Sequence, residues 1–313
     1  MSKEAVVYQA NPLIEGRRDF SLIETRLFYI GLRGLQGLQK LTTKENNFWS
    51  KNYKDEFPVT VITPRELMKL FGNDKYYSTL EDTCRKMAQK TVEVKKDGGK
   101  GFAVYPVFSV LTYTPSEGLT LEFNKYMIPW LLKLTNSPFT KIPFEQVWAL
   151  GSPYSVRLLE LLLQYQNTKT HERTLTIEEI RTCLNVPDTA YRGRMEAFRR
   201  RIVEFPVKDI NAKTAYKVEY EPVKEGRRIV AFKFKLHLPL EVKRAKRKER
   251  LEAIAKMPDI LPSMPKEGAN LATNHESNPV TDKQEGQAKP RREMPRELKD
   301  GFTQLKDILA KTV

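Results

Sequence analysis

The feature that most constrains the fold is a helix-start motif that occurs twice along the chain. Thr63-Pro64-Arg65-Glu66 and Thr176-Ile177-Glu178-Glu179 are both capping boxes. In such a motif the threonine oxygen and the glutamate three residues later each accept a hydrogen bond from the other's backbone N–H group. Apolar residues follow both motifs at helical spacing. The two motifs therefore predict a structural unit that is duplicated.

The same order of elements follows the motif in each unit: a short helix, a turn, a second helix and a β-hairpin. In the first unit the second helix carries Leu80, Cys84 and Met87, and the hairpin runs from Val94 to a return strand over 104–113. Helix, turn, helix and hairpin is the order of elements in a winged helix. The predicted fold class is α+β, with two tandem winged-helix domains and a flexible basic C-terminal tail.

Changes in composition set the predicted domain boundaries. An N-terminal arm over 1–10 precedes a first winged-helix domain over 11–135, which we expect to dimerise and to add DNA contacts. The second domain, over 136–242, is expected to do the main DNA reading. A basic, proline-containing stretch over 243–313 is too polar to bury a core, so we expect a disordered tail. An apolar stripe over 296–311 indicates a possible short helix there.

Charge points to a polyanion as the partner. The 313 residues include 54 Lys and Arg against 39 Asp and Glu, which gives a net charge of +15. A large positive excess attracts nucleic acid and speeds association with it. Net charge alone leaves a merely soluble basic protein as an alternative, so the distribution of the basic residues has to decide.

Catalytic and membrane classes find little support in the sequence. The three histidines are far apart and there are only two cysteines, so neither a metal cluster, a disulfide framework nor the metal site of a rolling-circle nickase can be assembled. The ATP-binding pattern G-x-x-x-x-G-K-[ST] does not occur, and no apolar run is long enough to span a membrane. We expect no catalytic residues, no metal, no cofactor, no membrane association and a cytoplasmic location.

The second helix of the second unit is the most informative segment for function. We expect it to start near Tyr191 and to pack through one apolar face. Its remaining surface is rich in arginine, and an arginine fork in the major groove can grip guanine O6 and N7. A solvated face paired with acidic neighbours is the alternative. The predicted inner face is Tyr191, Met195, Phe198, Ile202 and Phe205, and the predicted DNA contacts are Arg192, Arg194, Arg199, Arg200 and Arg201.

Further basic residues extend this predicted DNA-binding surface. The hairpin that comes next, over 218–220 and 229–236, carries a basic tip suited to phosphate contact. The equivalent helix of the first unit also contains Glu81 and Asp82, so a structural or dimer-forming role for it remains open. The predicted contacts in the second unit are Lys208, Lys224, Arg227 and Arg228, and those in the first unit are Lys75, Arg85, Lys86, Lys95 and Lys96.

Several blocks of the sequence resemble a known family, the initiator proteins of theta-replicating iteron plasmids. They are NPLIEGRR at 11–18, FSLIE at 20–24, SVRLLELL at 155–162, the block over 198–211 and YEPVKEGR at 220–227. The resemblance covers roughly residues 5 to 240 and leaves the tail out. It implies tandem winged helices that clamp one DNA repeat, the second unit giving the main major-groove reading.

The resemblance also implies a biological role. Monomers of such proteins bind direct repeats, the iterons, at a plasmid origin, and dimers bind an inverted repeat to repress their own gene. Origin opening and recruitment of the host initiator and replicative helicase follow. The runner-up interpretation is a winged-helix transcriptional repressor without an initiator role, and a nicking enzyme is a distant third.

Overall fold

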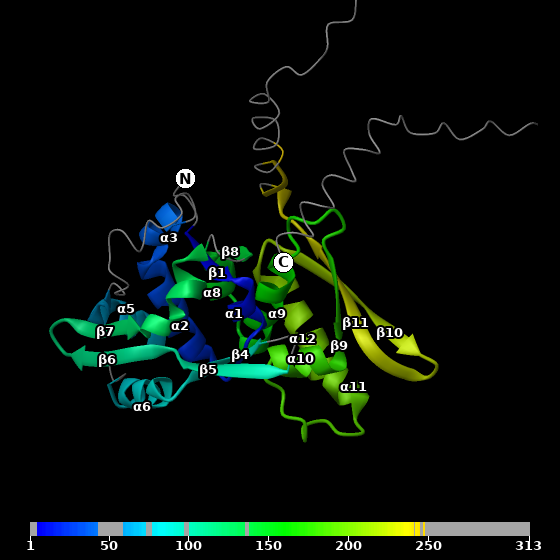
Figure 1. Cartoon of the computed structure of the whole chain (residues 1–313), viewed down its shortest axis with the longest axis horizontal. Helices are drawn as coiled ribbons and strands as arrows, with labels where there is room; N and C mark the ends of the chain where they lie inside the picture. Colours follow the sequence, from blue (N-terminus) through cyan, green and yellow to red (C-terminus); the bar gives the residue numbers. More distant parts are fainter. Residues whose placement is uncertain are drawn as a thin grey trace, which may run out of the picture. The chain divides into compact units, whose positions relative to one another are not determined.

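The computed structural model describes residues 5–42, 59–72, 77–96, 100–134, 138–240, 242–244 and 247. All of them belong to one unit, Met1–Met257. The predicted tail beyond 247, its possible helix at 296–311 and the boundary residues 135–137 lie outside the described residues. Within this unit the chain forms two winged helices (Figure 1).

The second winged helix has the predicted order of elements. Thr176 caps the first helix of the helix-turn-helix, and both hydrogen bonds of its capping box with Glu179 are present. The strands form a three-stranded sheet in the order β10-β11-β9. The elements are β9 (Glu172–Thr176), α10 (Ile177–Cys183), α11 (Met195–Phe198), the π-helical segment η4 (Arg199–Glu204), α12 (Phe205–Lys213), β10 (Lys217–Glu225) and β11 (Arg228–His237).

The first winged helix repeats this arrangement. Its sheet has the order β3-β7-β6, so in both units the strand before the helix-turn-helix pairs with the second strand of the hairpin. The capping box of Thr63 and Glu66 is again complete. The predicted α+β fold with two tandem winged helices is therefore confirmed. The elements are β3 (Thr60–Ile62), α5 (Pro64–Phe71), α6 (Tyr77–Ala88), β6 (Phe108–Thr114) and β7 (Gly118–Phe123).

The hairpin of the first unit differs from the prediction. The expected single return strand over 104–113 is broken at Val107 into β5 (Gly101–Pro106) and β6, which belong to different sheets. β5 pairs with β4 (Thr91–Lys96), and β4 pairs with β2 (Arg17–Arg18). The wing that corresponds to β10–β11 is therefore β6–β7, and β4–β5 is an additional hairpin.

Residues near the N-terminus join a strand from the middle of the chain. β1 (Val6–Ala10), within the predicted arm, pairs antiparallel with β8 (Phe139–Pro143). The predicted boundary between 135 and 136 remains a prediction. The other elements of this part are α1 (Asn11–Glu15), α2 (Leu22–Gly34), α3 (Gln36–Thr42), the 3₁₀ turn η2 (Lys125–Met127), α7 (Ile128–Leu131) and α8 (Phe144–Trp148).

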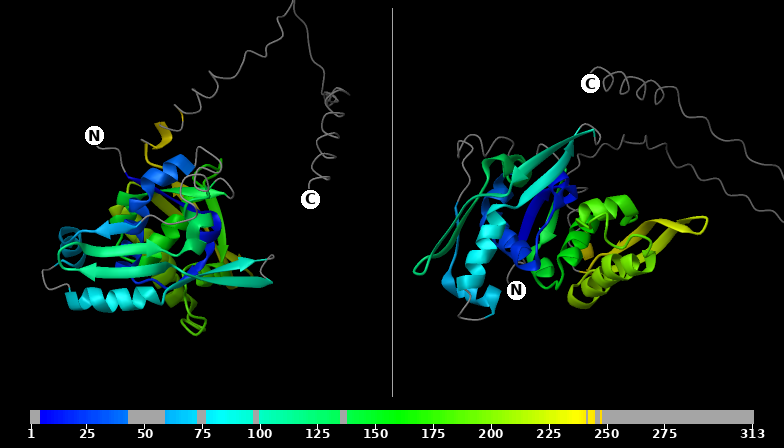
Figure 2. Two further views of the ribbon diagram at one scale, coloured as in Figure 1. Left: turned by 60° about the vertical axis from the view of Figure 1, so that its left-hand side comes forward. Right: turned by 90° about the horizontal axis from the view of Figure 1, so that it is seen from below.

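The helix α9 (Pro153–Leu163) lies at the junction of the two winged helices (Figure 2). Each of its residues from Ser155 to Leu163 is buried, because α9 contacts α1 and β8 on one side and α12 and β11 on the other. One cluster of buried apolar residues extends from Val7 to Leu238 through both winged helices. The helix α9 is thus a core element that the two winged helices share.

The arginine-rich helix starts later than the sequence pattern predicts. Tyr191 and Gly193 have left-handed backbone conformations, with φ of 59° and 66°, which an α-helix cannot contain. The helix therefore begins at Met195. Arg192 and Arg194 lie in the turn before it, so their predicted position on the helix is wrong.

A π-helical turn changes the inner face of the same helix. Over Arg199–Glu204 the helix holds one more residue per turn than an α-helix does, so the consecutive residues Ile202 and Val203 are both buried. The extra residue rotates the start of α12 about the helix axis, and Phe205 is 52% exposed. Phe198 and Ile202 belong to the core as predicted, whereas Phe205 does not.

Two truncations test this corrected face. Phe198→Ala is expected to lower the free energy of unfolding by about 3 to 5 kcal/mol, because it empties a fully buried site. Phe205→Ala is expected to lower it by about 1 kcal/mol at most, since that ring is already half in water. Urea denaturation of the two variants measures both values. Equal losses would contradict the π-helical turn.

Candidate nucleic-acid interface

The exposed side of the segment α11–η4–α12 carries the central part of the predicted DNA-binding surface. Arg200 and Arg201 are exposed, and neither forms an ion pair with any residue that the structure describes. On the same segment the side chains of Phe198 and Val207 are buried. The helix backbone thus holds both guanidinium groups towards solvent while its other side is fixed in the core.

Acidic neighbours on the same helix pair with two other predicted contacts. Arg199 Nη2 lies 2.7 Å from Glu196 Oε1, and Lys208 Nζ lies 2.6 Å from Glu204 Oε1. The hydrogen bond from Arg199 lowers the pKa of Glu196, so that carboxylate is ionised at neutral pH. Exposed ion pairs of this kind contribute little to stability and are screened by salt. Both cations can therefore exchange a carboxylate for a phosphate at small cost.

The two arginines of the preceding turn are also exposed. Arg192 Nε donates a hydrogen bond to the backbone oxygen of Asp188 at 3.2 Å, which orders the turn. Arg194 forms no ion pair within the described part of the chain. Gly193 lies between them, and a Cβ atom added to it would meet no atom within 4 Å. The turn is therefore open to a ligand on this side.

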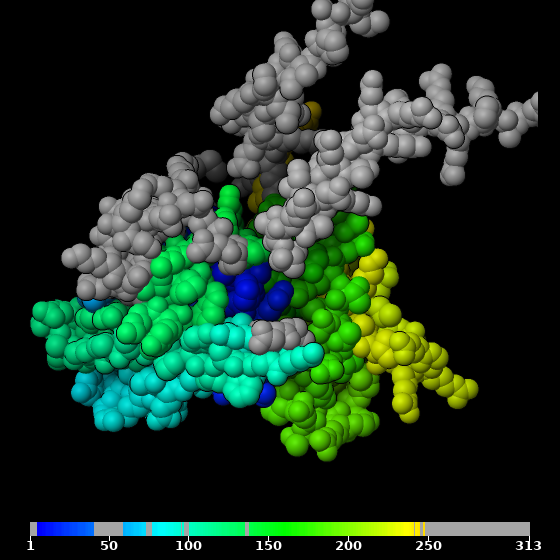
Figure 3. Space-filling view, in the orientation of Figure 1, coloured from blue at the N-terminus to red at the C-terminus, as the bar shows by residue number. Residues whose placement is uncertain are grey.

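The wing β10–β11 carries three exposed basic residues at its tip. In the strand register of β10 and β11, Lys224 lies opposite Ile229 and Glu225 lies opposite Arg228. Gly226, at φ 60°, and Arg227 form the turn between the strands. In Figure 3 this hairpin projects as a narrow extension beyond the helices of its own winged helix. Among the described residues, no acidic side chain pairs with Lys224, Arg227 or Arg228, so the tip presents free positive charge.

The corresponding surface of the first unit is less basic. On α6, Arg85 pairs with Glu81 at 2.7 Å and Lys86 pairs with Asp82 at 2.6 Å, both one helical turn apart. Its wing over 108–123 contains two glutamates and neither lysine nor arginine. Lys96 is exposed on the additional hairpin. Lys75 and the side chain of Lys95 lie outside the described residues.

Sequence reasoning did not identify a buried polar cluster at the junction of the two winged helices. Glu160 of α9 is 1% exposed in its side chain, and its Oε2 lies 2.5 Å from Arg18 Nη2 and 2.6 Å from Arg157 Nη1. Tyr29 donates its hydroxyl hydrogen to Oε1 at 2.5 Å. The signal available in the sequence was Arg157 and Glu160, two charged residues three apart in an otherwise apolar helix.

The charges in this cluster support one another. Burial alone would raise the pKa of Glu160, but the positive charges of Arg18 and Arg157 and the hydrogen bond from Tyr29 outweigh it, and the net shift is downward. Burial, together with the charge of Arg157, lowers the pKa of Arg18 to about 10. Glu160 and Arg18 are therefore both charged at neutral pH.

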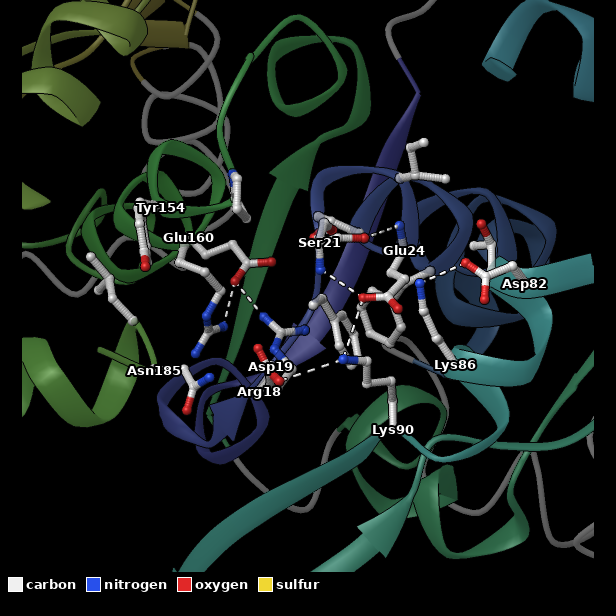
Figure 4. A pocket seen from close by; sticks show the side chains of 18 of the residues that line it. Arg18, Asp19, Ser21, Glu24, Asp82, Lys86, Lys90, Tyr154, Glu160 and Asn185 are labelled. Carbon is white, nitrogen blue, oxygen red and sulfur yellow. Dashed lines mark hydrogen bonds and ion pairs between the residues drawn. The ribbon is translucent and has the colours of Figure 1, made fainter. Parts of the chain in front are cut away.

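The cluster forms the floor of a cleft of about 570 Å³ between the two winged helices (Figure 4). Both signs of charge line it, and Lys86 is paired with Asp82 there. Lys90 Nζ lies 3.5 Å from Asp19 and 3.6 Å from Glu24. The charges of the cleft balance one another, so it has no net preference for an anion.

The described residues show neither a metal-binding cluster nor a membrane-spanning helix. These residues contain no group of three or more His, Cys, Asp or Glu side chains arranged to hold a metal ion. Among the helices of the described segments, none is long and apolar enough to cross a membrane.

Comparison with known proteins identifies both winged helices. The family described as "Initiator Replication protein, WH1" matches residues 6–163, and that described as "Initiator Rep protein, WH2" matches residues 176–236. A curated "Replication initiation protein" of Escherichia coli is 27% identical over 175 residues. That match covers 56% of this chain and 52% of the relative, so it spans about half the length of the relative.

A solved structure shares the fold of this chain. The structure described as "Crystal structure of Pi initiator protein in complex with iteron DNA" superposes with a TM-score of 0.54 at 19% identity, over 75% of this chain and 98% of that one. Domains 2 and 3 of RctB give a TM-score of only 0.37 at 9% identity, over 69% and 81% of the two chains. With both family matches in the same order as the two observed winged helices, the chain belongs to the replication initiator (Rep) family of iteron plasmids.

Proposed function

We propose that this chain initiates plasmid replication by binding the direct repeats of an origin in double-stranded DNA, reading base pairs with the segment α11–η4–α12. The observation that carries the proposal is that Arg200 and Arg201 are exposed and form no ion pair among the described residues. Both lie on the second helix of a helix-turn-helix. An exposed guanidinium on such a helix can donate two hydrogen bonds to guanine in the major groove.

The wing supports the same proposal. Lys224, Arg227 and Arg228 are exposed at the tip of β10–β11, where they can contact phosphates on either side of the groove that the helix occupies. Arg192, Arg194, Arg199 and Lys208 extend this surface. A solved structure that shares the fold of this chain is described as the Pi initiator protein in complex with iteron DNA, which supports a DNA repeat as the ligand.

We assign the first unit an accessory role in DNA binding and a role in self-association. Its recognition-helix cations Arg85 and Lys86 are already paired, and we expect them, with Lys75, Lys95 and Lys96, to add weak phosphate contacts. β6 is an edge strand of its sheet, and Val110 on it is 44% exposed. An edge of this kind can pair with another strand, which favours a dimer that represses the chain's own gene.

Origin opening completes the proposed function. Bending a duplex costs a few kcal/mol by elastic estimates, and many Lys and Arg contacts can offset that cost. We propose that opening results from DNA binding and deformation without covalent chemistry, and that the host initiator and replicative helicase are then recruited. A transcriptional repressor without an initiator role is the second candidate, because the same surface would serve it.

The DNA beside the gene distinguishes the two candidates. Several direct repeats next to an AT-rich segment, protected by the protein from DNase I, support initiation. Protection of a single inverted repeat alone would support repression and would contradict the initiator proposal.

Two substitutions separate base reading from phosphate contact. Arg200→Ala is expected to weaken binding to the protected repeat by about 1 to 3 kcal/mol and to leave binding to random duplex nearly unchanged. Lys224→Ala is expected to weaken binding to both and to lower the slope of log K against log salt by about 1. Fluorescence anisotropy at several salt concentrations measures both. Parallel losses on the repeat and on random DNA for Arg200→Ala would refute its role in base reading.

Opening without covalent chemistry is tested on supercoiled DNA that carries the repeats. Adding the protein is expected to make thymines of the adjacent AT-rich segment reactive to permanganate. The supercoiled DNA should stay unnicked in the presence of Mg²⁺ or Mn²⁺, because no nucleophile or metal site is part of the proposal. Nicking that persists in a highly purified preparation would refute it.

A further inference from the structure

The strongest unassigned feature is the buried polar cluster around Glu160, because it connects α9 to residues more than a hundred positions earlier in the sequence. Arg18 and Tyr29 come from the first winged helix and its N-terminal segment, and Glu160 comes from α9. Gln9 Nε2 also donates to Glu160 Oε1, at 3.4 Å. Both carboxylate oxygens of Glu160 are thus held by residues that precede position 30.

Arg157 carries the connection on to the second helix-turn-helix. Besides Glu160, its guanidinium donates to the backbone oxygen of Gly16 at 2.8 Å. It also donates twice to the backbone oxygen of Cys183, from Nη2 at 2.9 Å and from Nε at 3.1 Å. Cys183 is the last residue of α10, and the turn to the recognition helix comes directly after it. One guanidinium therefore ties the end of α10 to the N-terminal segment.

Other contacts run along the same path. Arg17 Nε donates to Asn185 Oδ1 at 2.6 Å, and Arg173 pairs with Glu15 at 3.4 Å. Figure 4 shows Arg18 and Glu160 facing each other, with Asn185 beside them. The second helix-turn-helix is thus connected to the first winged helix by directional bonds as well as by apolar packing.

Directional bonds matter here because apolar contacts specify position poorly. Apolar surfaces of similar shape can slide and repack at small cost, whereas a buried carboxylate is stabilised only if each donor is in place. The cluster is well suited to fix the separation and the rotation of the two winged helices.

We infer that Glu160 is a positioning residue for DNA binding. It determines the spacing that the protein accepts between the two half-elements of a DNA repeat, each half-element being the part that one winged helix contacts. The inference rests on the proposed function, in which both winged helices contact one duplex. One base pair inserted between the half-elements moves the second by about 3.4 Å along the helix axis and rotates it by about 35°. A rigid junction cannot accommodate that change, and a loosened junction can.

The experiment compares spacings. Duplexes carrying the repeat protected by the wild-type protein are made with one base pair inserted or deleted between the half-elements, and affinities are measured by anisotropy. The wild-type protein is expected to lose at least about tenfold in affinity for either change, equivalent to the loss of one good base contact. If the wild-type protein tolerates both changes, the inference is wrong whatever the variants do.

Glu160→Gln and Arg157→Lys are the test variants. Glu160→Gln removes the charge that holds Arg18 and Arg157. Arg157→Lys keeps a positive charge beside Glu160, but an ammonium group cannot span the carbonyls of Gly16 and Cys183 as the guanidinium does. Both are expected to bind the natural repeat more weakly and to reduce the spacing preference to about threefold or less. If either variant folds and keeps the full tenfold preference, the inference is overturned.

Gln39→Ala is the matched control. Gln39 is fully buried and hydrogen-bonds the backbone of Tyr8 and Leu131, both within the first unit. It should lower thermal stability and leave the spacing preference unchanged, so a general loss of stability can be told from a loosened junction. Failure of the wild-type protein to bind any repeat would instead refute the proposed function.

Discussion

The junction of the two winged helices contains one fully buried carboxylate, that of Glu160. Glu160 is removed from water, and that is tolerable only because Arg18, Arg157 and Tyr29 satisfy its oxygens. Arg18 and Tyr29 lie more than a hundred residues before Glu160 and Arg157 lies on α9 itself, so the carboxylate joins α9 to the N-terminal part of the chain. The apolar contacts of α9 with both winged helices add to stability, and the carboxylate adds hydrogen bonds and ion pairs of defined direction.

The surface proposed to bind DNA depends on this interior. Arg200 and Arg201 face solvent because Phe198, Ile202 and Val203 on the opposite side are fully buried. The turn before them comes after Cys183, whose backbone oxygen is held by Arg157. The path from the buried cluster to the exposed guanidinium groups is therefore short, consisting of α10, one turn and the start of the recognition helix.

Local signals in the sequence predicted local structure well. The capping boxes at Thr63 and Thr176 and the hairpin around Gly226 were identifiable because their hydrogen bonds join residues close in sequence. The split of the return strand at Val107 was not, because β6 is defined by its partner β7 and not by its own pattern. The start of the helix at Met195 was hidden by an apolar periodicity that continues back through the turn to Tyr191.

The buried cluster was harder to predict for a related reason. Glu160 and Arg157 stand out in an apolar helix, but nothing in the sequence connects them to Arg18 or Tyr29, which lie more than a hundred residues away. Of the candidate site, the exposed basic residues of the second helix and wing were predictable from composition. The ion pairs that engage Arg85, Lys86 and Arg199 depend on helix phase and side-chain rotamers.

The π-helical turn over Arg199–Glu204 has a consequence for how relatives of this chain can diverge. Such a turn holds one residue more than regular helical geometry requires, so a single codon deletion within it would restore an ordinary α-helix. Phe198 before the turn and Val207 and Ile210 after it would all stay in the core, because a regular helix one residue shorter places them on one face. A relative that lacks this residue would therefore present the same helix face to the DNA with one residue fewer between its core anchors.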